Sequence, residues 1–310
     1  MLDNLFIFIL INIFFMLYYY LVMEVLSLDN SLIVYFIVMS VIFGVVIGSF
    51  LNVVIYRIPA GRQIVKGHSM CMSCGHNLAA KDLIPILSWV SLKGKCRYCG
   101  APIASRYTKI ESFTGLTFLL LAIAAPTDTA LVPIYYGIPV VIFYYVYFIC
   151  LVLSFAAIIS MMMIHYDVRK CYVGFPIVIF IFKLISLVFP YLNKTITENR
   201  LNIFLNNIFA TFQFVGSAVV LTVLFTLLFH KKYTLSDLYF DLAMSVIPSY
   251  GLYFRLSEAQ AGPIQIQAVV TGLVYALLRS ILKDKKFDKY VGIIIVSVYL
   301  VILLIHKIAE

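Results

Sequence analysis

Long apolar segments separated by short charged loops constrain this chain more than any other feature of its sequence. Several segments approach or exceed the roughly 20 residues that an α-helix needs to cross a bilayer. Of the 310 residues, 63% are hydrophobic and 12% are charged, and the mean hydropathy is +1.03. A soluble domain is about half apolar and about a quarter charged. We therefore predict an all-α polytopic membrane protein surrounded by a lipid bilayer.

The apolar segments predict about nine transmembrane helices. They cover residues 5–26, 31–56, 110–125, 138–164, 172–190, 203–229, 238–254, 263–282 and 290–306. The first segment has no basic residue before it and no small-residue cleavage site after it, so we interpret it as a retained helix. Basic residues cluster in alternate loops, which the positive-inside rule assigns to the cytoplasm. The net charge of +9 therefore reflects topology, and no nucleic-acid partner is expected.

One long polar segment, residues 57–109, carries two Cys-x-x-Cys pairs. The pairs are Cys71/Cys74 and Cys96/Cys99, separated by 21 residues and each followed by glycine. Two residues between thiolates let one tight turn direct both sulfurs at a tetrahedral ion, and the glycine lets the backbone fold beneath it. This predicts a zinc-ribbon domain with structural Zn²⁺; disulfides or unliganded thiols are the alternatives. Nine Lys and Arg against one acidic residue place the loop in the cytoplasm, where reducing conditions favour metal.

Between the two cysteine pairs, residues 81–94 form an amphipathic segment that contains the chain's single tryptophan, Trp89. Two interpretations stay open at this stage. The segment lies against the membrane surface, or it packs on the ribbon.

Carboxylates at helix ends are candidate catalytic acids. Asp167 ends one predicted helix, Asp237 opens another, and Asp241 follows one helical turn later. The predicted topology puts Asp167 and Asp237 at the same depth on the cytoplasmic side. Two carboxylates that approach within a few ångströms cannot both ionise, so one acts as an acid while the other activates water. The alternative is a structural role, in which each acid caps a helix or pairs with a nearby base such as Arg169.

The chain resembles the type IV prepilin peptidase family (leader peptidase/N-methyltransferase). The resemblance starts at Gly48-Ser-Phe-Leu-Asn-Val-Val-Ile-Tyr-Arg57, includes both cysteine pairs, and closes on Glu111-Ser-Phe-Thr-Gly115. It implies four parts, listed in chain order. These are an additional N-terminal helix over 1–30, the signature helix over 31–56, the four-cysteine domain over 57–109, and a transmembrane peptidase domain over 110–310.

The resemblance implies an intramembrane aspartyl endopeptidase of the bacterial inner membrane. Such enzymes remove the short basic leader of type IV prepilins and pseudopilins at the cytoplasmic face, and many then methylate the new N-terminus with S-adenosylmethionine. Asp167 and Asp237 would be the catalytic acids, with Asp241 as the fallback for the second. If the helix register is as predicted, Asp241 lies one turn deeper and tolerates replacement by Asn. The particular pilin and the oligomeric state do not follow from the sequence.

Both acidic motifs depart from the family pattern. The family's Gly-x-Gly-Asp is Thr234-Leu-Ser-Asp237 here, without either glycine, and Asp167 is followed by Tyr172-Val-Gly-Phe175 instead of a Leu/Ile-Pro-Asp/Asn element. A catalytically degenerate relative that acts as a membrane zinc-ribbon scaffold is therefore the alternative function. A transporter with a metal-binding loop is a third interpretation, but its ionisable residues would lie in mid-helix rather than at helix ends.

Overall fold

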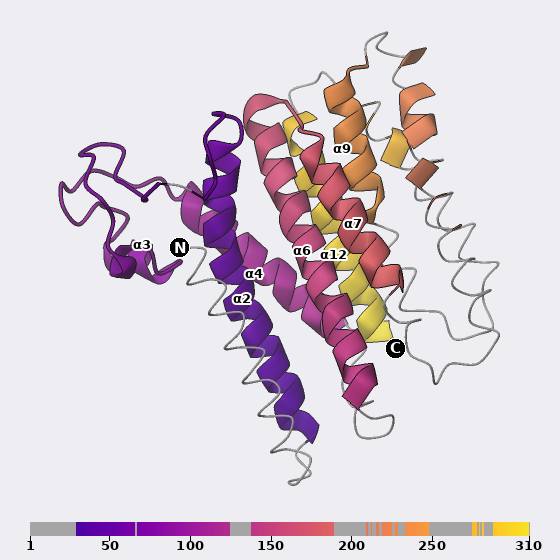
Figure 1. Ribbon diagram of the computed structural model, residues 1–310, viewed down its shortest axis with the longest axis horizontal. Coiled ribbons are helices and arrows are strands. Elements are labelled where there is room, and N and C mark those ends of the chain that lie inside the picture. Colours follow the sequence, from indigo (N-terminus) through magenta and orange to yellow (C-terminus); the bar gives the residue numbers. More distant parts are fainter. Residues whose placement is uncertain are drawn as a thin grey trace.

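Helices make up almost all the regular structure of the residues that the structure describes (Figure 1). The computed structural model describes residues 29–65, 67–124, 138–188, 233–247 and 288–309, with scattered positions between 209 and 228 and between 275 and 281. The longer helices are α2 (Asp29–Arg57), α4 (Arg106–Ala124), α6 (Ile138–Val168), α7 (Gly174–Val188), α9 (Leu235–Ser245) and α12 (Val291–Ala309); the short ones are η1 (Ala80–Asp82), α3 (Leu87–Ser91) and η4 (Asp288–Tyr290). No β-strand occurs in the described ranges, so the predicted helical class is confirmed there.

Two of the described helices are long and apolar enough to cross a membrane. They are Val34–Arg57 within α2 and Val146–Val168 within α6, and α7 contains a shorter apolar stretch, Gly174–Ser186. The predicted total of nine transmembrane helices is not established. The predicted helix over 5–26 and most of those over 203–229 and 263–282 lie outside the described residues.

The described helices overlap the predicted ones, but several ends differ. α6 ends at Val168, four residues after the predicted end, and α9 ends at Ser245, nine residues before it. Two helix starts also differ. α4 begins at Arg106, four residues before the predicted start, because the polar residues ahead of the apolar segment continue the helix. α9 begins at Leu235, three residues before the predicted start, because the side chain of Thr234 caps its first turn. In both cases, the apolar pattern locates the buried length of a helix but not its polar ends.

α2 and α4 approach each other closely at glycines. A Cβ atom on Gly44 would lie 2.8 Å from Cβ of Phe118 and 3.0 Å from Cα of Gly115. A Cβ atom on Gly48 would lie 2.8 Å from Cα of Glu111. Small residues at four-residue spacing allow this approach between helices in lipid, where van der Waals packing drives association. Gly44 and Gly48 therefore allow α2 and α4 to pack closely.

α6 lies between α2 and α7 in the described bundle (Figure 1). It contacts α2, α4, α7 and α9, and its residues Phe155, Ile158 and Ile159 are fully buried. α12 also presses against α6, because a Cβ atom on Gly292 would lie 2.7 Å from Cγ of Met162. Both α9 and η4 also contact α6.

Replacing Gly48 by valine should weaken the α2–α4 pair. The added atoms would meet the backbone of Glu111, which cannot move aside like a flexible side chain, and overpacking of this kind costs about 1–3 kcal/mol. Thermal unfolding of the purified protein in detergent should show a lower midpoint. Gly174→Ala is the matched control, because nothing lies within 4 Å of a Cβ at that position. An unchanged midpoint for Gly48→Val would contradict the described packing.

Candidate functional site

Four cysteine thiols meet in the loop between α2 and α4. The sulfur atoms of Cys71, Cys74, Cys96 and Cys99 all lie within 4.8 Å of one another, and those of Cys71 and Cys99 are 3.9 Å apart. Sulfurs arranged tetrahedrally at 2.3 Å from zinc are about 3.8 Å apart. None of the four is disulfide-bonded. The predicted cysteines therefore come together with the donor atoms and spacing of a four-thiolate metal site.

The same type of turn presents each cysteine pair. The N–H of Gly75 donates to the carbonyl of Cys71, and the N–H of Gly100 donates to the carbonyl of Cys96, both at 2.9 Å. Both glycines have left-handed backbones, with φ of 71° and 70°. Side chains with a Cβ rarely adopt this conformation, so each turn requires its glycine.

The cysteine sulfurs differ in how readily they lose a proton. Backbone N–H groups of Cys74 and Ser73 hydrogen-bond to the sulfur of Cys71 and lower the pKa of its thiol to about 6. The N–H of Ala101 favours the thiolate of Cys99, but desolvation and hydrogen bonds with the neighbouring cysteines raise the pKa of Cys99 to about 11. Sulfurs this close cannot all ionise without a cation to offset their repulsion. A metal ion supplies that charge, so affinity for it falls as pH falls and the thiols take up protons.

Asp167 lies in the last turn of α6 and forms an ion pair with Arg106, the first residue of α4. The carboxylate side chain is 25% exposed and the guanidinium side chain is 43% exposed. Ion pairs with this exposure contribute about 0–1 kcal/mol. The contact therefore links the end of the cysteine loop to α6 only weakly, and Asp167 can exchange Arg106 for another partner.

Asp237 caps the N-terminus of α9. The N–H and hydroxyl of Thr234 donate to Oδ2 of Asp237 at 2.9 and 2.7 Å, and the N–H of Asp237 donates to the hydroxyl oxygen of Thr234 at 3.3 Å. This reciprocal capping box satisfies N–H groups that have no partner within the helix. The other carboxylate oxygen, Oδ1, accepts from Nη2 of Arg279 at 3.1 Å. The capping alternative considered for this acid is thus observed.

The segments that carry Asp167 and Asp237 are joined directly. α6 ends before Arg169, whose left-handed backbone (φ 55°) turns the chain away from the helix axis. Two residues later, the N–H of Cys171 donates to the hydroxyl oxygen of Ser236 at 2.8 Å. Because Ser236 precedes Asp237, this hydrogen bond ties the start of α9 to the segment that follows Asp167.

Thr234 and Ser236 occupy the two positions at which the prepilin peptidase pattern has glycine. Thr234 is extended, with φ of −103°, and Ser236 lies within α9, so neither position requires a left-handed backbone. Each side chain instead makes a hydrogen bond that fixes the turn. The loss of both glycines therefore imposes no backbone strain here.

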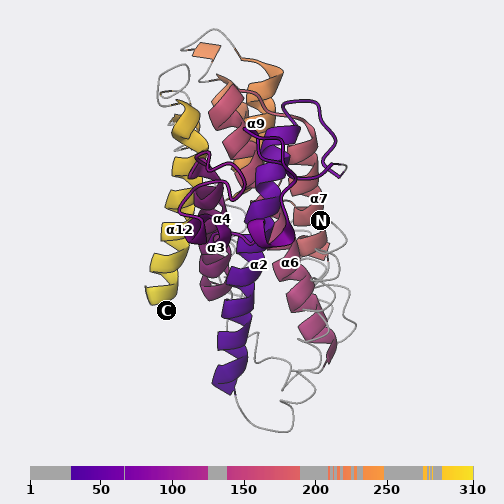
Figure 2. The same ribbon diagram turned by 90° about the vertical axis from the view of Figure 1, so that its left-hand side faces the viewer.

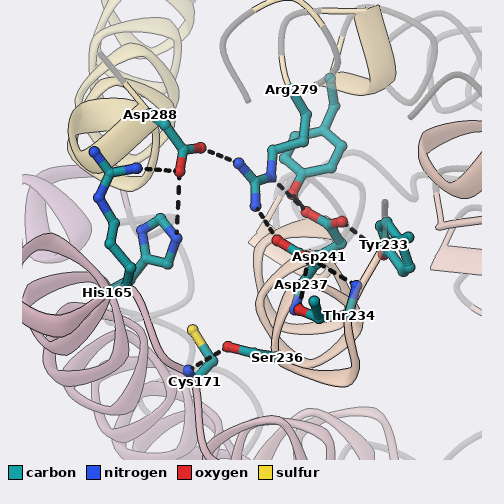
Figure 3. Close-up of polar contacts among 11 residues, drawn as sticks. His165, Cys171, Tyr233, Thr234, Ser236, Asp237, Asp241, Arg279 and Asp288 are labelled. Atoms are coloured by element: carbon teal, nitrogen blue, oxygen red, sulfur yellow. Dashed lines mark hydrogen bonds and ion pairs between the residues drawn. The ribbon is translucent and has the colours of Figure 1, made fainter. Parts of the chain in front are cut away.

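Arg279 joins three carboxylates at this end of the bundle (Figure 3). Its side chain is 1% exposed, and its nitrogens contact Asp237 at 3.1 Å and Asp241 at 3.1 Å. The third ion pair is with Asp288 in η4. Buried carboxylates are stable only when paired, so this guanidinium compensates charge contributed by two separate elements.

Asp241 is fully buried, one turn after Asp237. The hydroxyls of Tyr233 and Tyr275 each donate to it at 2.7 Å, in addition to Arg279. The expectation that Asp241 tolerates replacement does not fit these contacts. Asparagine would present an amide where a carboxylate now accepts three hydrogen bonds, and it would remove a charge that faces a buried guanidinium.

Asp288 completes the charged cluster. It accepts from Arg169 as well as Arg279, and Nε2 of His165 lies 3.9 Å from it (Figure 3). The ring of His165 packs on Phe240 of α9, with the ring centroids 4.3 Å apart. The end of α6, the start of α9 and η4 therefore share one polar junction.

The residues that connect the acids were not predicted from the sequence. Arg279 lies inside the predicted helix over 263–282, and an ionisable residue in a membrane helix is itself a signal of a functional or structural contact. Asp288 lies in a segment that was interpreted only through its excess of lysines. Asp288 lies two residues before the predicted helix over 290–306, so it too is an acid at a helix end.

The comparison with known families covers the first part of the described structure. Residues 42–125 match the family model of the Bacterial Peptidase A24 N-terminal domain. The matched A24 N-terminal domain contains the second half of α2, the four cysteines and α4. The resemblance to prepilin peptidases is confirmed over this stretch, which ends before Asp167 and Asp237.

Curated relatives of the chain carry prepilin peptidase names. The Prepilin leader peptidase/N-methyltransferase of Myxococcus xanthus is 49% identical over 83 residues, which are 27% of this chain and 25% of that protein. The Type 4 prepilin-like proteins leader peptide-processing enzyme of Escherichia coli O78:H11 is 38% identical over 107 residues, 29% of this chain and 40% of that protein. A Prepilin leader peptidase/N-methyltransferase of Dickeya chrysanthemi is 34% identical over 121 residues, 32% of this chain and 43% of that protein.

These matches span less than half the length of the relatives concerned. No solved structure matches the chain significantly. Together with the apolar helices α2 and α6, the relatives identify the chain as a membrane protein.

Replacing Arg279 by glutamine should destabilise the protein strongly. The change leaves the buried carboxylate of Asp241 without its cation, and breaking a buried ion pair from one side costs roughly 3–5 kcal/mol. Thermal unfolding in detergent measures the effect. Arg62→Gln is the matched control, because Arg62 is an exposed base that lies over the ring of Tyr56. Equal midpoints for the two variants would show that the Arg279 cluster is not the main electrostatic contact at this end.

Proposed function

We propose that this chain is a membrane-embedded aspartyl endopeptidase that removes the short basic leader of type IV prepilins or pseudopilins. The A24 N-terminal domain match and the names of the relatives support the general activity. The matched domain ends before both candidate acids, so one contact outside it supports the rest of the proposal. The hydrogen bond between Cys171 and Ser236 joins the segments on which the two candidate acids lie.

In this proposal Asp167 and Asp237 act as a catalytic pair. One carboxylate takes a proton from a water molecule that attacks the peptide carbonyl, while the other, protonated, gives its proton to the carbonyl oxygen. The first group then gives its proton to the leaving nitrogen as the C–N bond breaks, and the second takes a proton back from the diol, so both acids return to their starting states. The roles of the two acids are not assigned individually, because a coupled pair titrates as a unit. Asp241 remains the fallback for the second acid, although its burial and three hydrogen bonds favour a structural role.

The two acids have different resting partners. Asp167 is held by Arg106 in a partly exposed pair, whereas Asp237 is held by the buried Arg279. In the proposed reaction, substrate entry displaces Arg106 because that pair contributes little free energy. Arg279 stays in place, because two further carboxylates hold it.

The proposed location is the cytoplasmic face of the bacterial inner membrane. Nine basic residues against one acidic residue between positions 57 and 109 support a cytoplasmic cysteine loop. The Cys171–Ser236 contact supports placing both acids at one end of the bundle. A prepilin leader would therefore reach the acids from the cytoplasm, and the lipid bilayer would hold the apolar segment that follows it.

Several relatives are also named N-methyltransferases. We extend the proposal to methylation of the new N-terminus, with S-adenosylmethionine supplying the methyl group. No residue of the described ranges is assigned to this cofactor, since their left-handed glycines serve turns of the cysteine loop rather than a nucleotide-binding loop.

We propose that the metal of the four-cysteine site is a single structural Zn²⁺. Four thiolates leave no open coordination position for a reacting water molecule. The ion would connect the two cysteine turns and so hold the loop in its fold.

Metal analysis of the purified full-length protein should give close to one zinc per chain. Cys99→Ser should lower this content, and acidification should release the ion because the thiolates take up protons. Cys150→Ser is the control, since Cys150 is a buried, free cysteine of α6 outside the cluster. A folded sample without zinc, or with these cysteines oxidised to disulfides, would refute the assignment.

Asp167→Asn and Asp237→Asn should each abolish leader cleavage. Both carboxyl groups act in every turnover, and each ~1.4 kcal/mol of lost transition-state stabilisation lowers the rate tenfold. The measurement is cleavage of a co-expressed prepilin in membranes, with each variant adjusted to equal expression. Asp82→Asn serves as the control, because Asp82 belongs to the cysteine loop and pairs with Arg97.

The outcomes separate the possible assignments. Full activity of Asp167→Asn would end the aspartyl peptidase proposal. Full activity of Asp237→Asn, with loss in a normally folded Asp241→Asn variant, would move the second acid to Asp241.

The alternative function is a membrane zinc-ribbon scaffold that has lost catalysis. One observation favours it: both carboxylate oxygens of Asp237 already have partners, one as a helix cap and one as an ion pair. Absence of cleavage by the unmodified protein across several prepilins, with zinc still bound, would favour the scaffold.

A further inference from the structure

Three large apolar side chains are exposed in the segment between the two cysteine pairs. Ile84, Leu87 and Val90 are 46%, 67% and 58% exposed, at a spacing of three residues. Exposed lysines continue the same spacing at both ends, Lys81 before the stripe and Lys93 after it. We call Ile84, Leu87 and Val90 the α3 stripe. Large apolar side chains gathered this way on a small loop indicate a contact surface rather than chance exposure.

The opposite side of α3 is held by the protein. The indole Nε1 of Trp89 donates to the carbonyl of Ile103 at 3.1 Å, and its ring covers Gly94. The N–H of Ile86 donates to the carboxylate of Glu111 in α4 at 2.8 Å. Ile86 has φ of 60°, which is unfavourable for a β-branched residue and is held by this contact. The stripe therefore faces outward because the other side is fixed.

Glu111, the residue of α4 that holds α3, lies beside α2 well before the end of that helix. Glu111 packs against Gly48, which is nine residues before Arg57 at the end of α2. At 1.5 Å per residue this is about 13 Å back along the helix. Figures 1 and 2 both show α3 beside the length of α2 and not beyond its end. The exposed apolar side chains therefore lie beside a helix that is long and apolar enough to cross a bilayer, within reach of lipid.

The positive charge of the cysteine loop favours contact with anionic lipids. Nine bases against one acid lie between positions 57 and 109, and that acid, Asp82, is already bonded to Arg97 and Tyr98. Lysines beside an apolar stripe extend to anionic headgroups while their stems stay near the acyl chains. Three side chains also offer too little area for a stable protein interface, which needs roughly 1,200 Å² or more.

We propose that the α3 stripe inserts into the interfacial region of an anionic lipid bilayer, with Lys81 and Lys93 at the headgroups. The segment thus packs on the ribbon through Trp89 and on lipid through the stripe, which combines the two interpretations left open by the sequence. The inference does not depend on peptidase activity. The insertion would fix the height of the cysteine loop relative to the membrane.

Trp89 is the chain's only tryptophan and lies in α3 itself, so its fluorescence reports on the stripe without labelling. The full-length protein is reconstituted in nanodiscs of phosphatidylcholine, with or without phosphatidylglycerol. Bromine atoms are placed on the acyl chains either near the headgroups or near the chain ends. We expect stronger quenching by the shallow bromines, and an increase when phosphatidylglycerol is present.

The double variant Leu87→Ser/Val90→Ser should reduce quenching by the shallow bromines roughly two-fold or more, because the stripe loses its affinity for the acyl region. Both positions are exposed, so the fold should be preserved, and an unchanged unfolding midpoint checks this. Val65→Ser is the matched control, since Val65 is an exposed apolar residue of the same loop outside the stripe.

Equal quenching in the double variant and the unmodified protein would overturn the proposal. The proposal would also be overturned if bromine did not quench Trp89 fluorescence, but the fluorescence changed when a prepilin was added or when one nanodisc held two copies of the protein. Those results would assign the stripe to a substrate or to a second copy of the chain.

Discussion

A single buried guanidinium determines how several helices meet at one end of this molecule. Arg279 contacts two carboxylates of α9 and one of η4. Removing an unpaired carboxylate from water costs several kcal/mol, so α9 can lie against the bundle only with this cation in place. The candidate acid Asp237 precedes the fully buried Asp241 by one turn of the same helix. Its position therefore depends on a residue that belongs to neither acidic motif.

Patterns within short stretches of sequence predicted most of the described helices. The apolar segments over 31–56 and 138–164 correspond to α2 and α6, and the cysteine spacing predicted both metal-site turns. Such features depend on neighbours only a few residues away. The polar helix ends were less predictable, because hydrogen bonds such as the Thr234 cap extend α9 beyond its apolar residues.

Contacts between distant residues escaped prediction for a physical reason. Arg106 lies 61 residues from Asp167, and Arg169 lies 119 residues from Asp288. Neither pair leaves a periodic signal, because each contact depends on how the helices pack. The capping role of Asp237 could be anticipated from its place at a helix start, whereas its bond to Arg279 could not. The replaced glycines illustrate the same limit, since side-chain hydrogen bonds from Thr234 and Ser236 take over the turn.

Asp241 is added to the growing chain before Arg279 is. They are 38 positions apart, so a ribosome adding about 5–20 residues per second completes Arg279 roughly 2–8 s after Asp241. During that interval the Asp241 carboxylate lacks the guanidinium that offsets its charge in the folded protein. The folded arrangement of this end of the protein therefore cannot form until the segment that carries the arginine has been synthesised.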